Sequence, residues 1–407
     1  MYVNLHPDLS ESPAAKEAAD IVQSCVHCGF CNATCPTYQD GFDERDGPRG
    51  RIYLIKNMLE SGQASNVART HLDSCLTCRA CETTCPSGVE YGRLADIGRE
   101  MVDEIGERAF HQRIVRRLIR WVFPYSRRIG VLLGLGRFFS PVLPQALRRD
   151  IPPRQILDKR PGVTTPATRK MVVLQGCVQS VATPRTNHAA QRVLNRLGID
   201  LIEAKAAGCC GAVSYHLGAP DEGLDFMRCN IDAWWPLVEG GAESIIATAS
   251  GCGVMVKDYG ELLKSDPDYA TKARRISELA KDLSEVLDKE DLSAFADAAQ
   301  HSRTAVHCPC TLTHGQKLAG SLHSVLGMVG IPLTKTTEDH LCCGSAGTYS
   351  LLQPDMSQRL LKRKLKALTI DDPEQIVTAN IGCQLHLGTL SDVPVKHWIE
   401  LLDSANK

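Results

Sequence analysis

The sequence lacks any apolar run long enough to cross a membrane, and its first residues show neither the basic nor the apolar region of a signal peptide. It also lacks a charge bias, since 46 lysines and arginines face 47 acidic residues and leave a formal net charge of −1. So weak an overall field does not draw a protein to nucleic acid. We therefore expect a cytoplasmic protein with no transmembrane span and no nucleic-acid partner.

Common motifs of catalysis and nucleotide binding are missing as well. No G-x-G-x-x-G follows a predicted strand, and there is neither a P-loop nor a nucleophile elbow. The chain by itself therefore predicts no flavin or nicotinamide site and no catalytic residue. Cysteine, in contrast, is abundant, with 18 residues. In a chain without a secretory signal, this many cysteines indicate metal chemistry in a reducing compartment.

Eight of the cysteines form two copies of the pattern C-x2-C-x2-C-x3-C-P, which is the ligand spacing of proteins that hold two [4Fe–4S] clusters. A proline, Pro36 or Pro86, follows each copy and redirects the chain, so that the fourth thiol points away from the first three. In such pairs the fourth cysteine ligates the other cluster. Structural zinc usually has two separated C-x2-C pairs instead, and disulfides need an oxidising compartment. We predict cluster 1 on Cys25, Cys28, Cys31 and Cys85, and cluster 2 on Cys75, Cys78, Cys81 and Cys35.

Helices are predicted around both cysteine runs. Residues 10–24 form one, Gly47-Pro48 starts a second that Gly62 ends, and a third covers about 92–105. Arg49 and Arg51 lie either near cluster sulfurs, where they would raise the reduction potential, or on a solvated helix face. Residues 10–108 are thus predicted to be a helical ferredoxin-like domain with two [4Fe–4S] clusters.

Residues 109–168 are predicted to be a basic amphipathic segment followed by a proline-rich linker. Ten arginines and no acidic residue lie between 108 and 149, interleaved with apolar residues that include Trp121, Phe138 and Phe139. A stretch of this kind lies in a membrane interface, packs on the protein's own domains, or binds an acidic partner subunit. The two protein-contact interpretations are favoured over the membrane.

The remainder is an internal repeat, with predicted lobes at 169–300 and 301–405. In each copy a short apolar strand ends near a cysteine, a helix and a second strand follow, and a Cys-Cys-Gly (CCG) sequence comes next. The second strands are expected in 197–204 and 329–336. Strands alternating with helices predict parallel sheets, so the fold class is α+β multidomain, with two repeated α/β CCG lobes after the helical domain.

The cysteines of the repeat follow strand ends, where sites form in parallel sheets. We expect the two CCG sequences to converge on one cleft between the lobes, and a mid-helix Cys229 to be a buried structural thiol. Zero, one or two further clusters, or another redox site, are left open. The candidate ligands are Cys177, Cys209, Cys210, Cys252, Cys308, Cys310, Cys342, Cys343 and Cys383.

Together the paired cysteine runs and two CCG sequences resemble the iron–sulfur subunits of glycolate oxidase over nearly the whole chain. Specific stretches include D-G-P-R-G-R-I-Y-L-I-K, A-G-C-C-G-A-V and L-C-C-G-S-A-G-T-Y. The wider group includes the CCG-domain subunits of anaerobic glycerol-3-phosphate dehydrogenase and of heterodisulfide reductase, and a lactate-utilisation protein. In heterodisulfide reductase, CCG repeats bind non-cubane clusters through a terminal C-x2-C, whereas Cys252 and Cys383 each stand alone here.

This resemblance implies an electron-transfer subunit of a glycolate dehydrogenase complex. An FAD-containing partner subunit would oxidise glycolate to glyoxylate, and this chain would pass single electrons through its [4Fe–4S] clusters to a quinone or another membrane-linked acceptor, from the cytoplasm or the inner face of the membrane. The alternatives are a subunit of a related lactate or glycerol-3-phosphate dehydrogenase, a reductase acting at the CCG site, and a redox-sensing scaffold.

Overall fold

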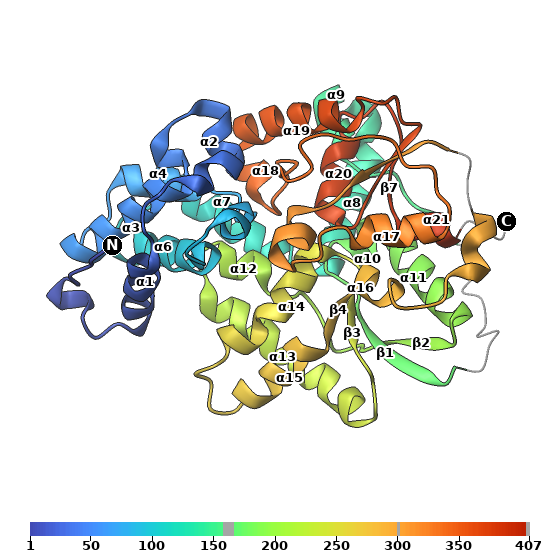
Figure 1. Cartoon of the computed structure of the whole chain (residues 1–407), viewed down its shortest axis with the longest axis horizontal. Coiled ribbons are helices and arrows are strands. Elements are labelled where there is room, and N and C mark those ends of the chain that lie inside the picture. Colours follow the sequence, from blue (N-terminus) through green and yellow to red (C-terminus); the bar gives the residue numbers. More distant parts are fainter. Residues whose placement is uncertain (158–166, 299–301, 404–407) are drawn as a thin grey trace.

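The computed structural model describes residues 1–157, 167–298 and 302–403. Figure 1 shows a helical N-terminal domain, in blue, packed against two α/β lobes, the first in green and yellow and the second in orange and red. The predicted fold class is therefore confirmed. Most of the chain is helical, and the strands are short and lie only in the lobes.

Short helices wrapped around the cysteine runs make up the helical domain. The sequence signals act locally as expected: Pro48 occupies the first turn of α3, and Gly62 follows its last residue in the left-handed conformation. The apolar residues of α3 and α6 pack against α1 in one core. The helices are α1 (Pro13–Ser24), α2 (Pro36–Gly41), α3 (Pro48–Ser61), α4 (Asn66–Asp73), α5 (Ala80–Thr84) and α6 (Tyr91–Ile105), with 3₁₀ turns at Pro7–Leu9, Phe30–Thr34 and Glu44–Asp46.

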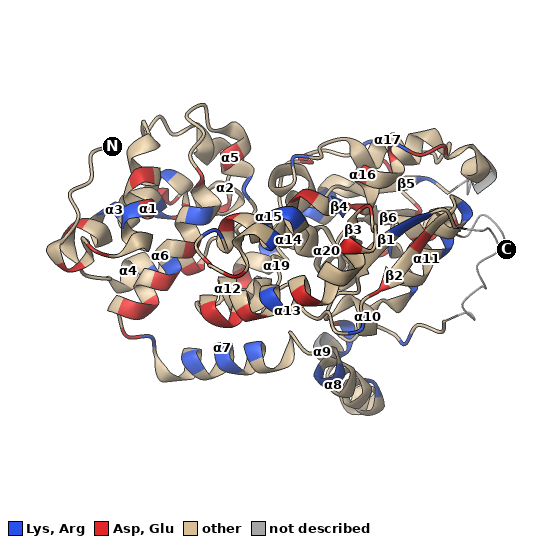
Figure 2. Ribbon diagram, turned by 90° about the horizontal axis from the view of Figure 1, so that it is seen from below, with Lys and Arg blue, Asp and Glu red and all other residues tan. Residues whose placement is uncertain are grey.

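The basic segment forms α7 (Phe110–Val122), α8 (Ser126–Phe139), a 3₁₀ turn (Ser140–Val142) and α9 (Gln145–Arg149). Helix α7 runs along one side of the molecule, and its arginines are blue in Figure 2. Helix α8 packs on α10 (Gln179–Ala182) of the first lobe. Within the described ranges, none of the helices combines the length and the apolar character that crossing a bilayer requires.

Four parallel strands in the order β2-β1-β3-β4 form the sheet of the first lobe. The crossover helices cover both of its faces, as parallel pairing requires. Its strands are β1 (Arg169–Leu174), β2 (Ile199–Glu203), β3 (Ile245–Ala247) and β4 (Ala280–Asp282). Its other helices are α11 (Pro184–Arg196), α12 (Ala212–His216), α13 (Pro220–Glu239), α14 (Ser250–Leu262), α15 (Ala270–Leu279) and α16 (Leu283–Leu287), with a 3₁₀ turn at Ser293–Ala298.

In the second lobe the sheet has three parallel strands in the order β5-β6-β7. The strand expected in 329–336 is wrong, because this stretch makes only one isolated bridge, between Thr304 and Leu333. Pro332 has no N–H to donate to a ladder, although its carbonyl accepts from Thr304. The elements are β5 (Thr304–His307), a π turn (Thr311–Gly315), α17 (Ser321–Met328), α18 (Tyr349–Leu352), α19 (Pro354–Leu368), β6 (Gln375–Thr378), α20 (Ile381–Gly388), β7 (Val395–His397) and α21 (Ile399–Asp403).

A single apolar core joins the two lobes, with Val193 from the first and Trp398 from the second among its buried residues. The C-terminal ends of β3 and β6 also meet directly. The amide of Ser250 donates to the carbonyl of Ala379 at 3.0 Å, and the His397 ring contacts the carbonyl of Thr248 at 2.8 Å. The two lobes therefore share one core, against which the helical domain packs.

The helical domain contacts both lobes through side chains that lie close to its second cysteine run. Arg79 forms an ion pair with Asp258 of the first lobe at 2.6 Å. The Tyr349 hydroxyl of the second lobe donates to the carbonyl of Ser74 at 3.0 Å. The second cysteine run therefore lies against the two lobes.

Candidate iron–sulfur centres

Both N-terminal cysteine runs fold into the same left-handed turn. Two residues in each run have positive φ: His27 and Gly29 in the first, Thr77 and Arg79 in the second. The reversal brings backbone amides toward sulfur, so that the N–H of His27 donates to Cys25 and that of Thr77 donates to Cys75, both at 3.4 Å. These turns aim three thiols at one point and leave backbone donors around it, which suits an anionic cluster.

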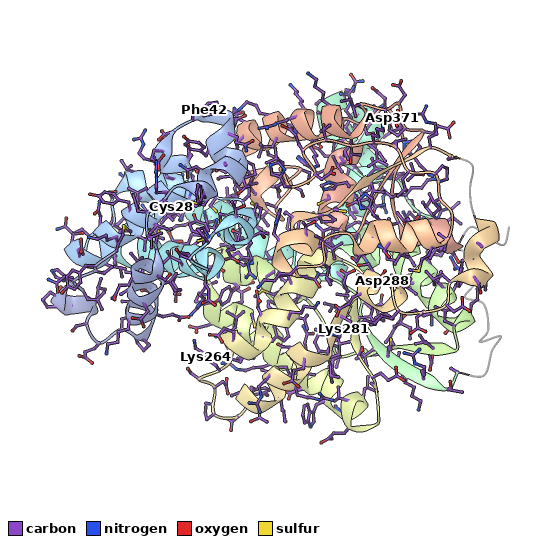
Figure 3. The ribbon with its side chains drawn as sticks, viewed as in Figure 1. Cys28, Phe42, Lys264, Lys281, Asp288 and Asp371 are labelled. Carbon is purple, nitrogen blue, oxygen red and sulfur yellow. The ribbon has the colours of Figure 1, made fainter. Side chains whose placement is uncertain are left out.

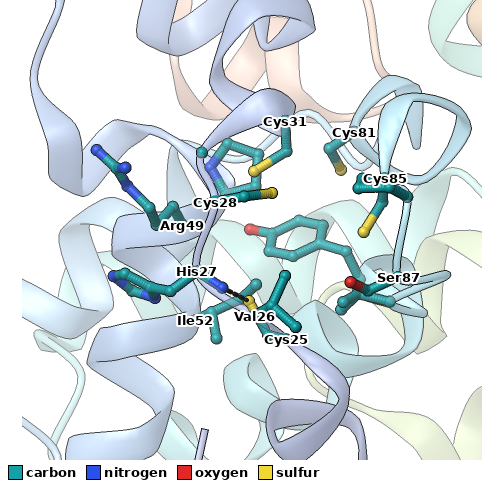
Figure 4. A pocket seen from close by; sticks show the side chains of 15 residues that line it. Cys25, Val26, His27, Cys28, Cys31, Arg49, Ile52, Cys81, Cys85 and Ser87 are labelled. Carbon is teal, nitrogen blue, oxygen red and sulfur yellow. Dashed lines mark hydrogen bonds between the residues drawn. The ribbon is translucent and has the colours of Figure 1, made fainter.

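The first pocket is lined by the four thiols assigned to cluster 1 and by Cys81 (Figure 4). Its rim reaches the molecular surface, because Cys28 is exposed, as are Val26 and Phe30 beside it. Figure 3 marks the position of Cys28 in the helical domain. The remaining lining is mostly apolar, and it includes Ile52 and Tyr91.

A second pocket is lined by Cys35, Cys75, Cys78 and Cys81, which are the four thiols assigned to cluster 2. Cys81 borders both pockets, so the two sites are immediate neighbours. Cys35, from the first run, lines this second pocket, and Cys85, from the second run, lines the first. The donor sets on the two sides fit two [4Fe–4S] clusters.

Positive charge is concentrated at the second pocket. Arg51 is buried, and its guanidinium lies 4.0 Å from the sulfur of Cys35 while it donates to Thr37 and Ser74. Arg99 donates to the carbonyl of Cys75 at 2.6 Å. Burial would raise the pKa of the Cys75 thiol, but the two guanidinium groups outweigh it and hold that pKa below its usual value.

Three other thiols of the two pockets are shifted in the opposite direction. Burial raises the pKa of Cys31 to about 11, and it raises the pKa values of Cys78 and Cys81 well above the ordinary value. Neighbouring thiols add to this effect, because several thiolates at one place repel each other. Buried thiols crowded in this way are stabilised as thiolates by metal ions, which supply the missing positive charge.

The first lobe holds a group of four thiols. Interactions with Cys209 and Cys252 lower the pKa of Cys210 well below its usual value. Interactions with Cys177 and then with Cys210 raise the pKa of Cys209, and the interaction with Cys210 raises the pKa of Cys252. Cys177 contacts Cys209. Gly211 has φ +89°, and a side chain there would meet the carbonyl of Gly223 at 2.6 Å, so only glycine fits behind the pair.

A matching group occupies the second lobe. The thiols of Cys310, Cys342, Cys343 and Cys383 contact one another in that order. Gly344 repeats the left-handed conformation, with φ +90° and the carbonyl of Ser357 only 2.7 Å from where a side chain would begin. The amide of Gly344 donates to Cys342 at 3.5 Å, as that of Gly211 donates to Cys209.

Three expectations about the repeat are corrected. The CCG thiols gather within each lobe and not in one cleft between the lobes, since each pair contacts cysteines of its own lobe. Cys229 is exposed and not buried, because α13 turns Met227 and Asn230 toward the core and Cys229 away from it. Cys308 stands apart from the thiol group, and its sulfur contacts the His323 ring at 3.6 Å.

One donor was not assigned from the sequence. His307 ends β5 and is buried with Cys343 and Cys383. Two other histidines have ordinary partners: His314 contacts Thr83, and His216 contacts Asp96. The sequence did carry a signal, because the first lobe has leucine at the position that corresponds to His307.

Comparison with known proteins agrees with this architecture. A model described as a 4Fe-4S dicluster domain matches residues 21–89, and one described as a cysteine-rich domain matches residues 171–257 and 304–388. The glycolate oxidase iron-sulfur subunit of Escherichia coli K12 is 49% identical over 405 residues, which cover 100% of this chain and 99% of that protein. The chain belongs to the glycolate oxidase iron–sulfur subunit family. Proteins of this family are subunits of an oxidoreductase complex, and the cofactors of this chain are iron–sulfur clusters.

More distant relatives match different shares of this chain. A probable glycolate oxidase iron-sulfur subunit of Bacillus subtilis 168 is 30% identical over 395 residues, covering 89% of this chain and 88% of that protein. Lactate utilization protein A of Bacillus velezensis is 26% identical over 245 residues, which are 58% of this chain but 99% of that protein. The lactate alternative therefore has only distant support.

Proposed function

We propose that this chain carries single electrons from a flavoprotein subunit that oxidises glycolate to glyoxylate. Glycolate would lose two electrons and two protons, with hydride passing to FAD on the partner. The reduced flavin would then release its electrons one at a time to cluster 1. Crossed ligation belongs to this proposal, with Cys85 on cluster 1 and Cys35 on cluster 2.

The observation that carries the proposal is the pair of adjoining four-thiol pockets, one open to the surface and one facing the lobes. Cys28, Val26 and Phe30 form an exposed, largely apolar rim at the first pocket. This rim is the proposed docking point of the flavoprotein. Cluster 2 would receive the electrons next, because Cys81 borders both pockets.

The lobes would continue the relay. Leu76 and Cys78 of the helical domain pack in one apolar cluster with Cys342 and Cys310 of the second lobe. The four-thiol groups of both lobes are proposed as further metal centres. In the first lobe, α10 begins two residues after Cys177, and α8 packs on α10. The basic segment thus adjoins the last proposed centre.

We infer that the acceptor is a quinone and that α7 and α8 rest on an anionic lipid surface. In α7 the usual orientation of an amphipathic helix is reversed. Arg116 and Arg120 pair with Asp73 and Glu222 of the protein body, at 2.7 and 2.9 Å, and only Ile119 is buried. The apolar stripe faces outward instead: Phe110 is 71% and Trp121 58% exposed.

Helix α8 extends this surface with Leu132, Leu135 and Phe138, all of which are exposed. Arg113 and Arg117 of α7 flank the stripe and have no ion-pair partner among the residues that the structure describes. Aromatic and apolar side chains flanked by arginine are typical of helices that lie in the headgroup region of anionic membranes. A quinone would then take two electrons and two protons, to become quinol, beside the first lobe.

Anaerobic reconstitution of the full chain with its flavoprotein tests the proposal. Glycolate should bleach the iron–sulfur absorbance only when both proteins are present, and quinone should restore it. The Cys229→Ser variant should behave like the wild type in this assay, because Cys229 is an exposed cysteine outside every thiol group. Bleaching by glycolate in the absence of the flavoprotein, or turnover that leaves the clusters oxidised throughout, would contradict the proposed relay.

A further inference from the structure

The side chain of His307 is the least satisfied polar group of the second lobe. It is 1% exposed, and neither ring nitrogen has a hydrogen-bond partner within the described part of the chain. Buried polar atoms in native proteins are nearly always paired, and leaving two unpaired costs free energy. We therefore expect the imidazole nitrogens to bind a ligand, such as a metal ion, that is not part of the protein.

Two thiols lie where such a partner would bind. A ring nitrogen of His307, the sulfur of Cys343 and the sulfur of Cys383 are all within 4.8 Å of one another, and all three residues are buried. Ligands bound to one tetrahedral zinc or iron ion, at about 2.0–2.3 Å from it, lie about 3.5 Å apart. A small contraction of the three side chains around an ion is therefore enough.

Comparison of the two lobes shows that packing does not require a histidine here. His307 and Leu174 are the last residues of equivalent strands, each three positions before the first cysteine of its thiol group. Leu174 is buried and apolar, as expected of a residue at the end of a central strand. The same fold thus accepts leucine at this position, and the imidazole of the second lobe needs another explanation.

A buried ammonium group points to negative charge at the same place. Lys364 is 2% exposed, and its Nζ donates to the backbone carbonyl of Glu338 at 2.8 Å, with no carboxylate partner within the described ranges. Its charge interacts most with the carboxylate of Asp339, and then with Cys343, Cys342 and Cys308. Buried charges in proteins are compensated, and thiolates bound to a metal supply the compensation.

We propose that His307, Cys343 and Cys383 bind one borderline-soft divalent ion, iron or zinc, in the second lobe. Binding forms one metal–nitrogen and two metal–sulfur bonds, and two protons leave from the thiols. The ion is either a separate centre or one iron of a cluster that includes Cys342 and Cys310. In both cases the second lobe differs from the first, whose group has thiols alone. The proposal does not depend on glycolate or on the flavoprotein.

The test measures iron and zinc per chain in the anaerobically purified full-length protein and records pulsed EPR and zinc-edge X-ray absorption. We expect an imidazole nitrogen on the metal: a nitrogen-14 coupling if the ion is iron, or a nitrogen neighbour at about 2.0–2.1 Å if it is zinc. His307→Leu, which copies the first lobe, should remove this signal and at least one ion per chain. The EPR signals of clusters 1 and 2 should persist.

Two further variants keep the result interpretable. His307→Cys should retain the ion and lose the nitrogen signal, which separates ligation from misfolding. Cys308→Ser is the neighbouring control and should change neither. The proposal is overturned if the wild-type protein shows no imidazole nitrogen on iron or zinc, or if His307→Leu keeps the full metal content. Neither outcome involves substrate turnover, so failure of the electron relay would be seen separately.

Discussion

The guanidinium of Arg51 lies 4.0 Å from the sulfur of Cys35 and is 1% exposed. The arginine at the first pocket, Arg49, is partly exposed and pairs with Glu44, whereas Arg51 is buried, although it also pairs with Asp46 at 3.4 Å. Buried positive charge favours the reduced cluster, which carries one more negative charge. Cluster 2 should therefore have the higher reduction potential of the two, so that electrons move inward.

Arg51→Met should lower the potential of cluster 2 by tens of millivolts, on the order of what one partly compensated charge contributes. Potentiometric titration followed by EPR measures it. Arg69→Met is the matched control, since Arg69 is also buried but donates to backbone carbonyls of Val102 and Glu107. Equal shifts in the two variants would show that the effect is structural and not electrostatic.

Cys35→Ser should remove cluster 2 and spare cluster 1, although Cys35 belongs to the first cysteine run. The protein should lose about four irons per chain, and the EPR signal that remains should be that of the surface cluster. Cys229→Ser should change neither quantity. Loss of cluster 1 alone in Cys35→Ser would show that each run builds its own cluster.

His397 makes stability depend on pH. Burial lowers the pKa of His397 to about 4 from its usual 6.5, so the folded state keeps the ring neutral. Between pH 6.5 and pH 4 the unfolded chain binds the proton and the folded chain does not, so the free energy of unfolding falls as the pH falls. At about 1.4 kcal/mol per pKa unit, the loss approaches about 3 kcal/mol at pH 4.

His397→Gln tests this contribution. The glutamine amide can still donate to the carbonyl of Thr248, which the ring contacts at 2.8 Å. We expect the variant to be less stable than the wild type at pH 7.5 and to approach or exceed it at pH 5, as thermal unfolding at both values will show. A constant difference between the two proteins would mean that His397 does not titrate on unfolding.

Trp121→Glu should weaken binding to anionic vesicles at least tenfold and leave binding to neutral vesicles negligible. The exposed ring would lose its place in the headgroup layer, and the new charge would be repelled by the lipids. Flotation with vesicles containing phosphatidylglycerol measures it. Phe42→Glu is the control, since Phe42 is 74% exposed but lies in the helical domain, at the position marked in Figure 3.

If the wild-type protein fails to float with anionic vesicles at low salt, the exposed apolar face of α7 and α8 does not bind a lipid surface. Co-elution of the flavoprotein that is lost in Trp121→Glu would then assign this surface to the partner. Binding that is insensitive to salt would likewise argue against the arginines, because screening weakens exposed charge contacts.

Local signals predicted local structure well. The Gly47-Pro48 start and the Gly62 end of α3 appear as expected, because capping and proline geometry act within a few residues. The strand expected in 329–336 failed for a local reason too, since Pro332 interrupts the ladder. The strand was predicted because residues 329–336 are largely apolar, and the effect of Pro332 on hydrogen bonding was given too little weight.

What the sequence could not supply was the relation between distant segments. Each CCG pair joined the thiols of its own lobe, because strand ends within one sheet are closer than equivalent ends of two lobes. The reversed orientation of α7 depends on Asp73 and Glu222, which lie far from it in the sequence. His307 could be recognised as a candidate ligand only from two facts together: it is buried, and the equivalent residue of the first lobe is Leu174.

The proposed crossed ligation also has a consequence for assembly. The segment from Cys35 to Cys75 lies wholly within the segment from Cys25 to Cys85, so the two clusters close nested loops. Insertion of cluster 2 shortens the free chain that cluster 1 must close. Insertion of cluster 1 brings the two ends of the inner loop close together, so each cluster lowers the entropic cost of closing the other loop. Cofactor insertion should therefore be cooperative. During maturation, molecules with one cluster should be rarer than those with none or two.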